Sequence, residues 1–291
     1  MLSFMIRKNG SVVDPLIEDS SGEPDFDKAA LKAVKSWRYD PATLDGDPVE
    51  QRQTRLVLTF AMDLPRRGAG LRFREGYTRA SERLAEGDYA GAEQEWQSLA
   101  DYDGWNLYET ARLWALYGLI GEASSDDAKA LSGLERATRG GVAYLDKDFY
   151  VAALRKMFVL NLRANDHAGA LMIYSRLERQ PGSLDGYPQL VDAAVALREL
   201  VNGNEVLVVQ GALADVAGKP LWTRRLLRRQ ISLNAIRGRL DLVDFRCEWG
   251  RATYKPEESV TWTLPAEWGD CDVYLTGKRG ARFTLLELPA Q

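Results

Sequence analysis

The sequence predicts an α+β protein of three successive segments, because the spacing of its apolar residues changes twice along the chain. Residues 1–64 combine alternating strand patterns with one helix, residues 65–202 have helical spacing, and residues 203–291 return to short strands. The expected parts are a strand–strand–helix–strand domain, a domain of helical hairpins, and a small all-β domain.

The first segment opens with a predicted β-hairpin, followed by a helix and a third strand. Its first strand alternates apolar with other residues, and Asn9-Gly10 is a strong turn signal because both residues tolerate positive φ. A helix is expected from Pro24 to about Trp37. The third strand is expected where apolar residues alternate again, at Leu56, Leu58, Phe60 and Met62.

The second segment contains a pattern that recurs about every forty residues. Small residues stand at Ala92, Ala130 and Ala170, and an aromatic residue follows four positions later in the first and last copies, at Trp96 and Tyr174. This pattern resembles the tetratricopeptide repeat, in which the small residue lets paired helices approach closely. It predicts three stacked hairpins and a capping helix near residues 187–202, since a single hairpin cannot bury its apolar face alone.

The third segment is punctuated by glycine and proline between short apolar runs. Such regularly spaced strands predict a small β-sandwich or barrel.

Charge and composition exclude several classes of protein. The net charge is −4 with acids and bases mixed along the chain, which argues against a nucleic-acid binder. No run of eighteen apolar residues is present, and no signal peptide is recognisable, so we expect a cytoplasmic protein or a chain whose targeting segment is missing. Any membrane association is expected through a missing anchor or a partner.

Four motifs in the first segment occur in a characteristic order. They are Asn9-Gly10-Ser11-Val12, Phe26-Asp27-x-Ala29-Ala30, Trp37-Arg38-Tyr39-x-Pro41, and the strand ending at Phe60. Together they resemble the C-terminal domain of TonB, the energy transducer of the bacterial cell envelope. The resemblance covers about a fifth of the chain, and the family's membrane anchor and Pro-rich spacer are not part of it.

This resemblance implies a partner-binding edge on the third strand. Transducers of this family capture an extended peptide from an outer-membrane transporter by β-augmentation, in which unpaired backbone groups accept another strand. The corresponding residues here are Thr54, Arg55, Leu56, Val57, Leu58, Thr59 and Phe60. The alternative is that the helical segment covers this edge.

The helical segment offers a second candidate surface for a protein or peptide partner. Stacked hairpins commonly bind peptides in the groove that they form, and the candidate side chains are Tyr77, Trp105, Tyr108, Arg112 and Tyr117. Packing between helices is the alternative for each of them.

Two further features have two interpretations each. Cys247 and Cys271 are predicted to form a disulfide, which suits an oxidising compartment such as the periplasm, and the alternative is two buried thiols. The basic run at residues 224–229 is either a lipid-binding patch or, as we favour, a solvated face paired with Asp241 or Asp244.

No catalytic motif accompanies these features. The single histidine, His167, has no evident nucleophile or metal-binding partners, and no phosphate-binding or dinucleotide-binding glycine motif occurs. We therefore expect no cofactor, no metal and no enzymatic activity. The sequence predicts an envelope adaptor that binds other proteins, with a structural scaffold, or an enzyme with an interdomain site, as the alternatives.

Overall fold

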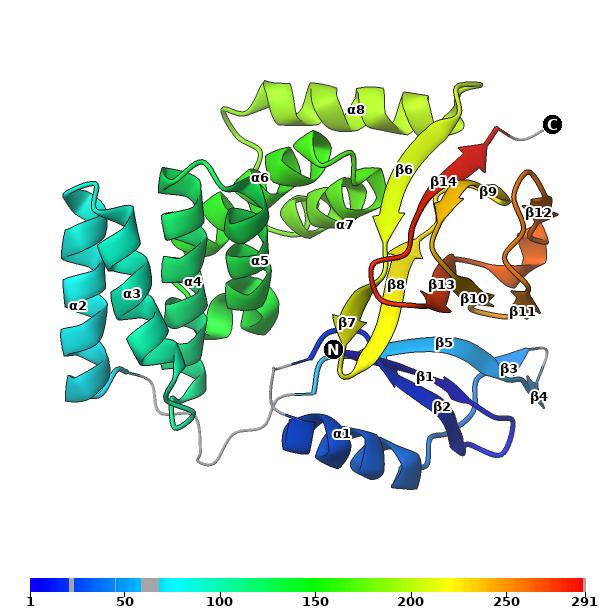
Figure 1. The fold of residues 1–291 in the computed structure, drawn as a ribbon, viewed down its shortest axis with the longest axis horizontal. Coiled ribbons are helices and arrows are strands. Elements are labelled where there is room, and N and C mark those ends of the chain that lie inside the picture. The colour runs from blue at the N-terminus through cyan, green and yellow to red at the C-terminus, as the bar shows by residue number, and fades with distance from the viewer. Residues whose placement is uncertain (21–23, 45, 59–67, 290–291) are drawn as a thin grey trace. The chain divides into compact units, whose positions relative to one another are not determined.

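A computed structural model confirms the predicted α+β class (Figure 1). It describes residues 1–20, 24–44, 46–58 and 68–289. The chain divides into two compact units, of which the first is Met1–Thr59 together with Arg198–Gln291 and the second is Phe60–Leu197.

The first unit begins with an antiparallel sheet of order β2-β1-β5, formed by β1 (Leu2–Ile6), β2 (Val12–Ile17) and β5 (Gln51–Leu56). The predicted hairpin joins β1 to β2, and Gly10 in its turn has a φ of 77°. That conformation favours glycine because a side chain would strain it. The backbone amide of Gly10 also donates to the Arg7 carbonyl at 2.8 Å.

Helix α1 (Pro24–Ser36) packs on one face of this sheet. Ala30 and Val34 on its apolar side are buried against the alternating β1 residues Leu2, Phe4 and Ile6. A short hairpin of β3 (Thr43–Leu44) and β4 (Asp47–Pro48), absent from the prediction, precedes β5. The apolar residues of β1 thus line the face of the sheet that α1 covers. The opposite face needs another part of the chain to cover it.

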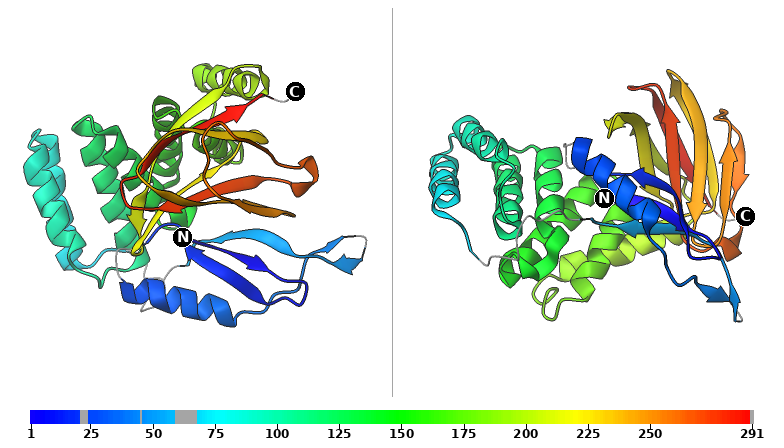
Figure 2. Two further views of the ribbon diagram at one scale, coloured as in Figure 1. Left: turned by 45° about the vertical axis from the view of Figure 1, so that its right-hand side comes forward. Right: turned by 90° about the horizontal axis from the view of Figure 1, so that it is seen from below.

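The third predicted segment forms a β-sandwich rather than a barrel (Figure 2). One sheet has the order β11-β10-β13-β8-β7 and the other has the order β12-β9-β14-β6. Alternate side chains of both sheets, among them Ile231, Phe245, Val273 and Leu285, form one shared core. The strands are β6 (Leu207–Ala212), β7 (Ala214–Val216), β8 (Lys219–Arg225), β9 (Gln230–Arg237), β10 (Leu240–Cys247), β11 (Arg251–Tyr254), β12 (Thr261–Thr263), β13 (Cys271–Gly277) and β14 (Arg282–Leu288).

The second unit contains the predicted helical hairpins, three within the described residues. They are α2 (Leu71–Ala85) with α3 (Tyr89–Ala100), α4 (Leu107–Ala123) with α5 (Asp127–Ala137), and α6 (Lys147–Arg163) with α7 (His167–Glu178). Helix α8 (Pro188–Asn202) follows them, close to the range expected for a capping helix. Their relation to the tetratricopeptide family stays a prediction.

The turns of the hairpins show why the pattern repeats. Residues with positive φ (Gly87, Ser125 and Asn165) each precede an aspartate that caps the next helix. Each aspartate side chain accepts a hydrogen bond from an amide three residues later. The small residues Ala92, Ala130 and Ala170 are fully buried, as their expected role in close helix packing requires.

Candidate partner-binding site

The candidate strand begins and ends earlier than predicted. It is β5, which ends at Leu56 opposite Leu2, the first residue of β1. The prediction of a strand that continues to Phe60 was wrong for Val57 and Leu58, because β1 offers no pairing partner beyond Leu56. Thr59, Phe60 and the expected Met62 lie outside the described residues.

β5 is an edge strand of its sheet, so one row of its backbone groups points away from β1. The amide of Glu18 donates to the carbonyl of Met1, which directs the backbone of Met1 towards β2. Because the pattern alternates in an antiparallel pair, Leu2 and Phe4 face β5, opposite Leu56 and Thr54. The amide and carbonyl of Arg55 therefore point away from β1.

The sandwich already contacts the first half of β5. The amide of Arg52 donates to the carbonyl of Glu248 at 3.0 Å, beside the end of β10. The side-chain amide of Gln53 donates to Asp272 at 3.1 Å and to the Tyr274 hydroxyl at 2.8 Å. Arg52 and Gln53 of β5 are thus both bonded to the sandwich.

An ion network fixes Arg55 of β5 to the sandwich. Arg55 donates to Glu18 at 2.8 Å and lies 2.8 Å from Asp272, and both carboxylate side chains are fully buried. Tyr274 donates a hydrogen bond to Glu18 as well. The Tyr274 hydroxyl also lies 3.4 Å from the Ser3 hydroxyl. We call Ser3, Glu18, Gln53, Arg55, Asp272 and Tyr274 the polar junction.

Burial changes the titration of this junction. Burial raises the pKa of Asp272, although the nearby Arg55 and Arg225 cations partly offset the effect. Burial and the neighbouring Glu18 raise the pKa of Tyr274 to about 12. The pKa of Arg55 is also raised, because Asp272 and Glu18 outweigh the opposing effect of burial. Burial thus opposes ionisation of Asp272, whereas pairing with Arg55 favours it.

A second ion network joins the first sheet to the sandwich. Asp244 accepts from Arg246 and Arg251, each at 2.9 Å, and Arg251 also donates to Asp14 of β2 at 2.6 Å. These contacts explain why the first and third predicted segments, expected as separate domains at 1–64 and 203–291, share one compact unit. The open face of the first sheet is covered by polar contacts.

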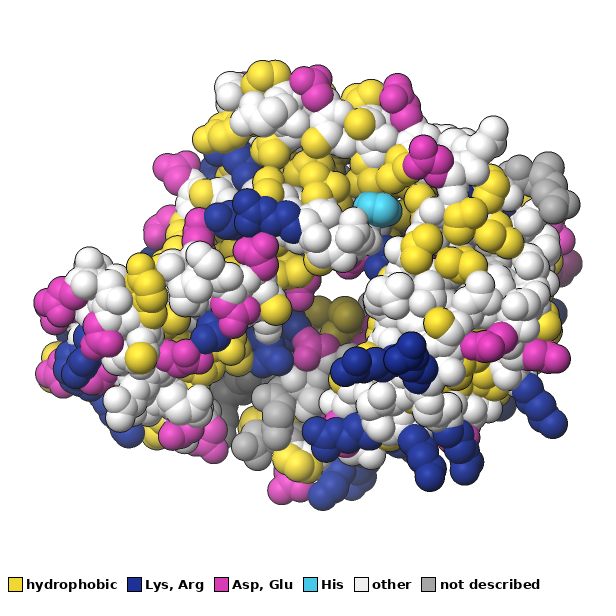
Figure 3. All heavy atoms as spheres, turned by 45° about the horizontal axis from the view of Figure 1, so that its top comes forward, with side chains coloured by type: hydrophobic (Ala, Val, Ile, Leu, Met, Phe, Trp, Pro, Cys, Tyr) yellow, Lys and Arg dark blue, Asp and Glu magenta, His cyan; other side chains and the backbone are white. Residues whose placement is uncertain are grey.

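The converging acids of the junction do not form an accessible catalytic site. The side chains of Asp272 and Glu18 are both 0% exposed, so a substrate cannot reach either carboxylate. Within the described residues no group of histidine, cysteine, aspartate or glutamate side chains is arranged to hold a metal ion. No helix in the described part of the chain is long and apolar enough to cross a membrane. On the face drawn in Figure 3, basic and acidic side chains are interspersed.

The structure brings together part of the predicted helical surface. On α4, the Arg112 guanidinium carbon lies 4.6 Å from the centre of the Tyr108 ring. Burial raises the pKa of Tyr77 on α2, and the Arg112 cation partly offsets this effect. Trp105 instead packs against Phe73, 5.0 Å between ring centroids, and donates to the Leu99 carbonyl. For Trp105 the alternative of packing between helices fits these contacts.

Tyr117 also lies among other aromatic residues. Its ring stacks on Trp96 with 4.2 Å between centroids, and it also contacts Trp114. The candidate helical surface is therefore concentrated at Tyr77, Tyr108 and Arg112.

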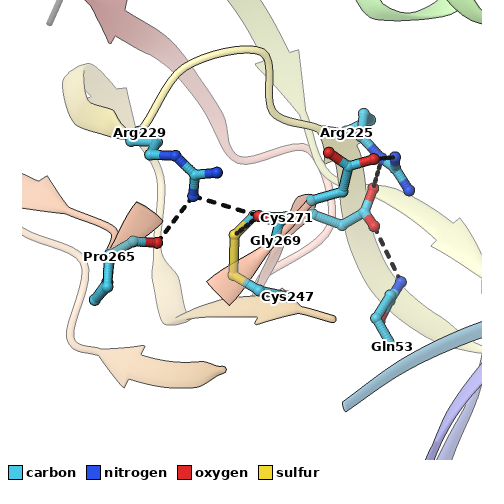
Figure 4. The surroundings of a disulfide bond; sticks show 9 residues. Gln53, Arg225, Arg229, Cys247, Pro265, Gly269 and Cys271 are labelled. Carbon is cyan, nitrogen blue, oxygen red and sulfur yellow. Dashed lines mark hydrogen bonds and ion pairs between the residues drawn. A yellow bond between two sulfur atoms is a disulfide. The ribbon is translucent and has the colours of Figure 1, made fainter. Parts of the chain in front are cut away.

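The predicted disulfide is present in the sandwich. Cys247 and Cys271 stand directly opposite each other on β10 and β13 and are bonded through their sulfur atoms (Figure 4). Both are buried. Their chain neighbours Glu248 and Asp272 both contact β5, so the disulfide lies beside the junction.

The favoured pairing of the basic run at residues 224–229 with Asp241 or Asp244 was wrong, because Asp241 binds Arg239 and Asp244 binds Arg246 and Arg251. Arg225 binds Asp270 and Asp272, and Arg229 donates to the carbonyls of Pro265 and Gly269 (Figure 4). Arg228 is buried and donates to the carbonyls of Leu200, Val201, Gly203, Glu205 and Glu287. These arginines therefore bind backbone carbonyls and acids of their own unit, and Asp241 and Asp244 are not among the partners.

The sequence analysis did not identify the junction residues of the sandwich. Asp272 and Tyr274 alternate with the core residues Val273 and Leu275, and all four are buried. A tyrosine and an acid on the outward face of a strand resemble a solvated face, so periodicity alone gives no signal. Only the burial of both faces shows that another part of the chain covers them.

The first unit is thus a small sheet with an edge strand, bonded to a β-sandwich in which a disulfide joins β10 and β13. The second unit consists of helical hairpins. Residues 1–61 match the family described as Gram-negative bacterial TonB protein C-terminal. This match supports the resemblance for the first domain and covers 61 of the 291 residues. No curated protein matches the chain.

Proposed function

We propose that this chain is a non-enzymatic adaptor of the bacterial cell envelope, which binds an extended segment of a partner protein. The observation that carries the proposal is the position of β5 at the edge of a sheet whose sequence matches the TonB C-terminal family. In such domains an edge strand can pair with a partner strand through backbone hydrogen bonds. A segment of an outer-membrane transporter is a partner of this kind.

The receiving backbone begins at Arg55. Arg52 is already bonded to Glu248, and the side chain of Gln53 is held by Asp272 and Tyr274, which fixes the start of β5. A strand fixed in this way is ordered before the partner arrives, so less conformational entropy is lost on binding. The exposed Val57 beyond it extends the surface. The helical surface at Tyr77, Tyr108 and Arg112 is a second place for the partner.

The location follows from the same features. The family match and the Cys247–Cys271 disulfide both favour the periplasm, since disulfides persist in oxidising compartments.

A structural scaffold is the second candidate function. Its supporting observation is the polar junction, which ties the first domain to the sandwich through Arg55 and Gln53. In this alternative the first domain only packs against the sandwich and recruits nothing.

A backbone probe separates the two functions. We would add a blocked hexapeptide of alternating threonine and valine, or its N-methylated twin, and follow amide exchange of Arg55 by NMR. An adaptor predicts that the first peptide slows the exchange of Arg55, whereas the N-methylated peptide has no effect because it lacks backbone donors. If both peptides changed the amide exchange of Arg55 equally, strand addition at β5 would be refuted.

A further inference from the structure

The helical unit holds an arginine that already binds a carboxylate of its own chain. Arg112 on α4 donates from Nη2 to Oδ2 of Asp146 at 3.0 Å. Its guanidinium carbon lies 4.6 Å from the centre of the Tyr108 ring, a cation–π distance. Tyr77 is close enough for the Arg112 cation to lower the pKa that burial has raised.

Asp146 is an exception among the helix-capping aspartates. Asp88, Asp126 and Asp166 each accept a hydrogen bond from the helix that they begin. Asp146 holds the same position before α6, yet its side chain makes no capping hydrogen bond. It points instead to Arg112, although its side chain remains 74% exposed.

Arg112 has an unused donor. Its Nε atom is buried and has no hydrogen-bond partner among the described residues. A guanidinium can bind a carboxylate with two parallel hydrogen bonds, and such paired bonds are stronger than a single one. Asp146 supplies only one contact, so the site is not saturated by the resident carboxylate.

We propose that Arg112 and Tyr108 form a subsite for a glutamate or aspartate side chain of the partner segment, and that Asp146 is the carboxylate it displaces. This inference rests on the proposed function, because it names the chemistry of the partner. The displaced Asp146 is free to cap α6, which would stabilise the first turn of that helix. Arg112 would thus lose its one hydrogen bond to Asp146 and gain two parallel hydrogen bonds to the partner's carboxylate, while Asp146 becomes the cap of α6.

A peptide pool tests the proposal. The probes are blocked octapeptides with one central glutamate and random flanks, and a second pool with glutamine in its place. The readouts on the full chain are the NMR signal of the Arg112 Nε–H group and the apparent affinity for each pool. The variants are Asp146→Asn, which removes the resident carboxylate, and Arg112→Gln, with Arg112→Lys retaining the charge. The matched control is Glu122→Gln, which removes an exposed carboxylate from Lys156 between the same two helices.

The proposal expects the glutamate pool alone to shift the Arg112 signal. Asp146→Asn should strengthen glutamate binding about tenfold, equal to about 1.4 kcal/mol, while Arg112→Gln should remove the preference for glutamate over glutamine. Glu122→Gln should change neither the affinity for the glutamate pool nor its preference over the glutamine pool. Peptide binding that leaves Arg112 unshifted and is insensitive to Asp146→Asn overturns the subsite but leaves the adaptor function standing. Binding of neither pool by any variant overturns the subsite and the helical surface together, and the β5 probe then decides the adaptor function separately.

Discussion

Replacing Arg55 by methionine tests the polar junction. Methionine keeps an unbranched side chain but leaves Glu18 and Asp272 as buried carboxylates without their shared cation. Removing one partner of a buried ion pair typically destabilises a protein by 3–5 kcal/mol. Because the Arg55 side chain is 28% exposed and Arg225 still lies 3.4 Å from Asp272, we expect about 3 kcal/mol, the lower end of that range.

Native-state hydrogen exchange of β13 is the suitable assay, since it reports on the first unit alone. A loss of about 3 kcal/mol corresponds to roughly a hundredfold faster exchange of its most protected amides. Arg52→Met is the matched control, because Arg52 pairs with Glu50 on the surface, where both side chains are 38% exposed. We expect it to change stability by about 0.5 kcal/mol or less. If Arg55→Met accelerates exchange no more than Arg52→Met, the junction does not hold the unit together.

Three further predictions follow from the packing. The free energy of unfolding of Asp272→Asn should rise relative to that of the wild type as pH rises from 4 to 7, because the folded wild type is destabilised when Asp272, whose pKa is raised, ionises. Urea unfolding at each pH measures this difference, and a difference that does not change with pH would contradict the prediction. Replacing both Cys247 and Cys271 by alanine should lower stability by roughly 3 kcal/mol for a separation of 24 residues, and reductant should then have no effect on urea unfolding. Gly133→Ala should destabilise the helical unit by about 2 kcal/mol or more, since a Cβ there would stand 2.3 Å from the Gly118 nitrogen, while Ser132→Ala should be nearly neutral in thermal unfolding.

Local signals in the sequence predicted most elements because each has a local physical cause. The Asn9-Gly10 turn, the buried alanines of the hairpins and the short strands of the sandwich all follow from periodicity and turn chemistry. The end of β5 was misplaced because it depends on where β1 begins, a pairing that alternation within residues 56–62 does not show.

Contacts between distant parts of the chain could not be predicted in the same way. Glu18 and Tyr274 are 256 positions apart, and nothing near either residue indicates the other. The basic run at residues 224–229 illustrates the same limit, since Arg228 reads as a surface charge until its five carbonyl partners are placed around it. The cysteine pair was easier, because only two cysteines occur.

Amide exchange along β5 in the isolated protein shows whether this edge is open. With an open edge, the outward amide of Arg55 should exchange roughly a hundredfold faster than the amides of Thr54 and Leu56, which face β1. The bonded amide of Arg52 should be protected and provides an internal reference. Protection of Arg55 equal to that of its two neighbours would contradict an open edge and favour the scaffold.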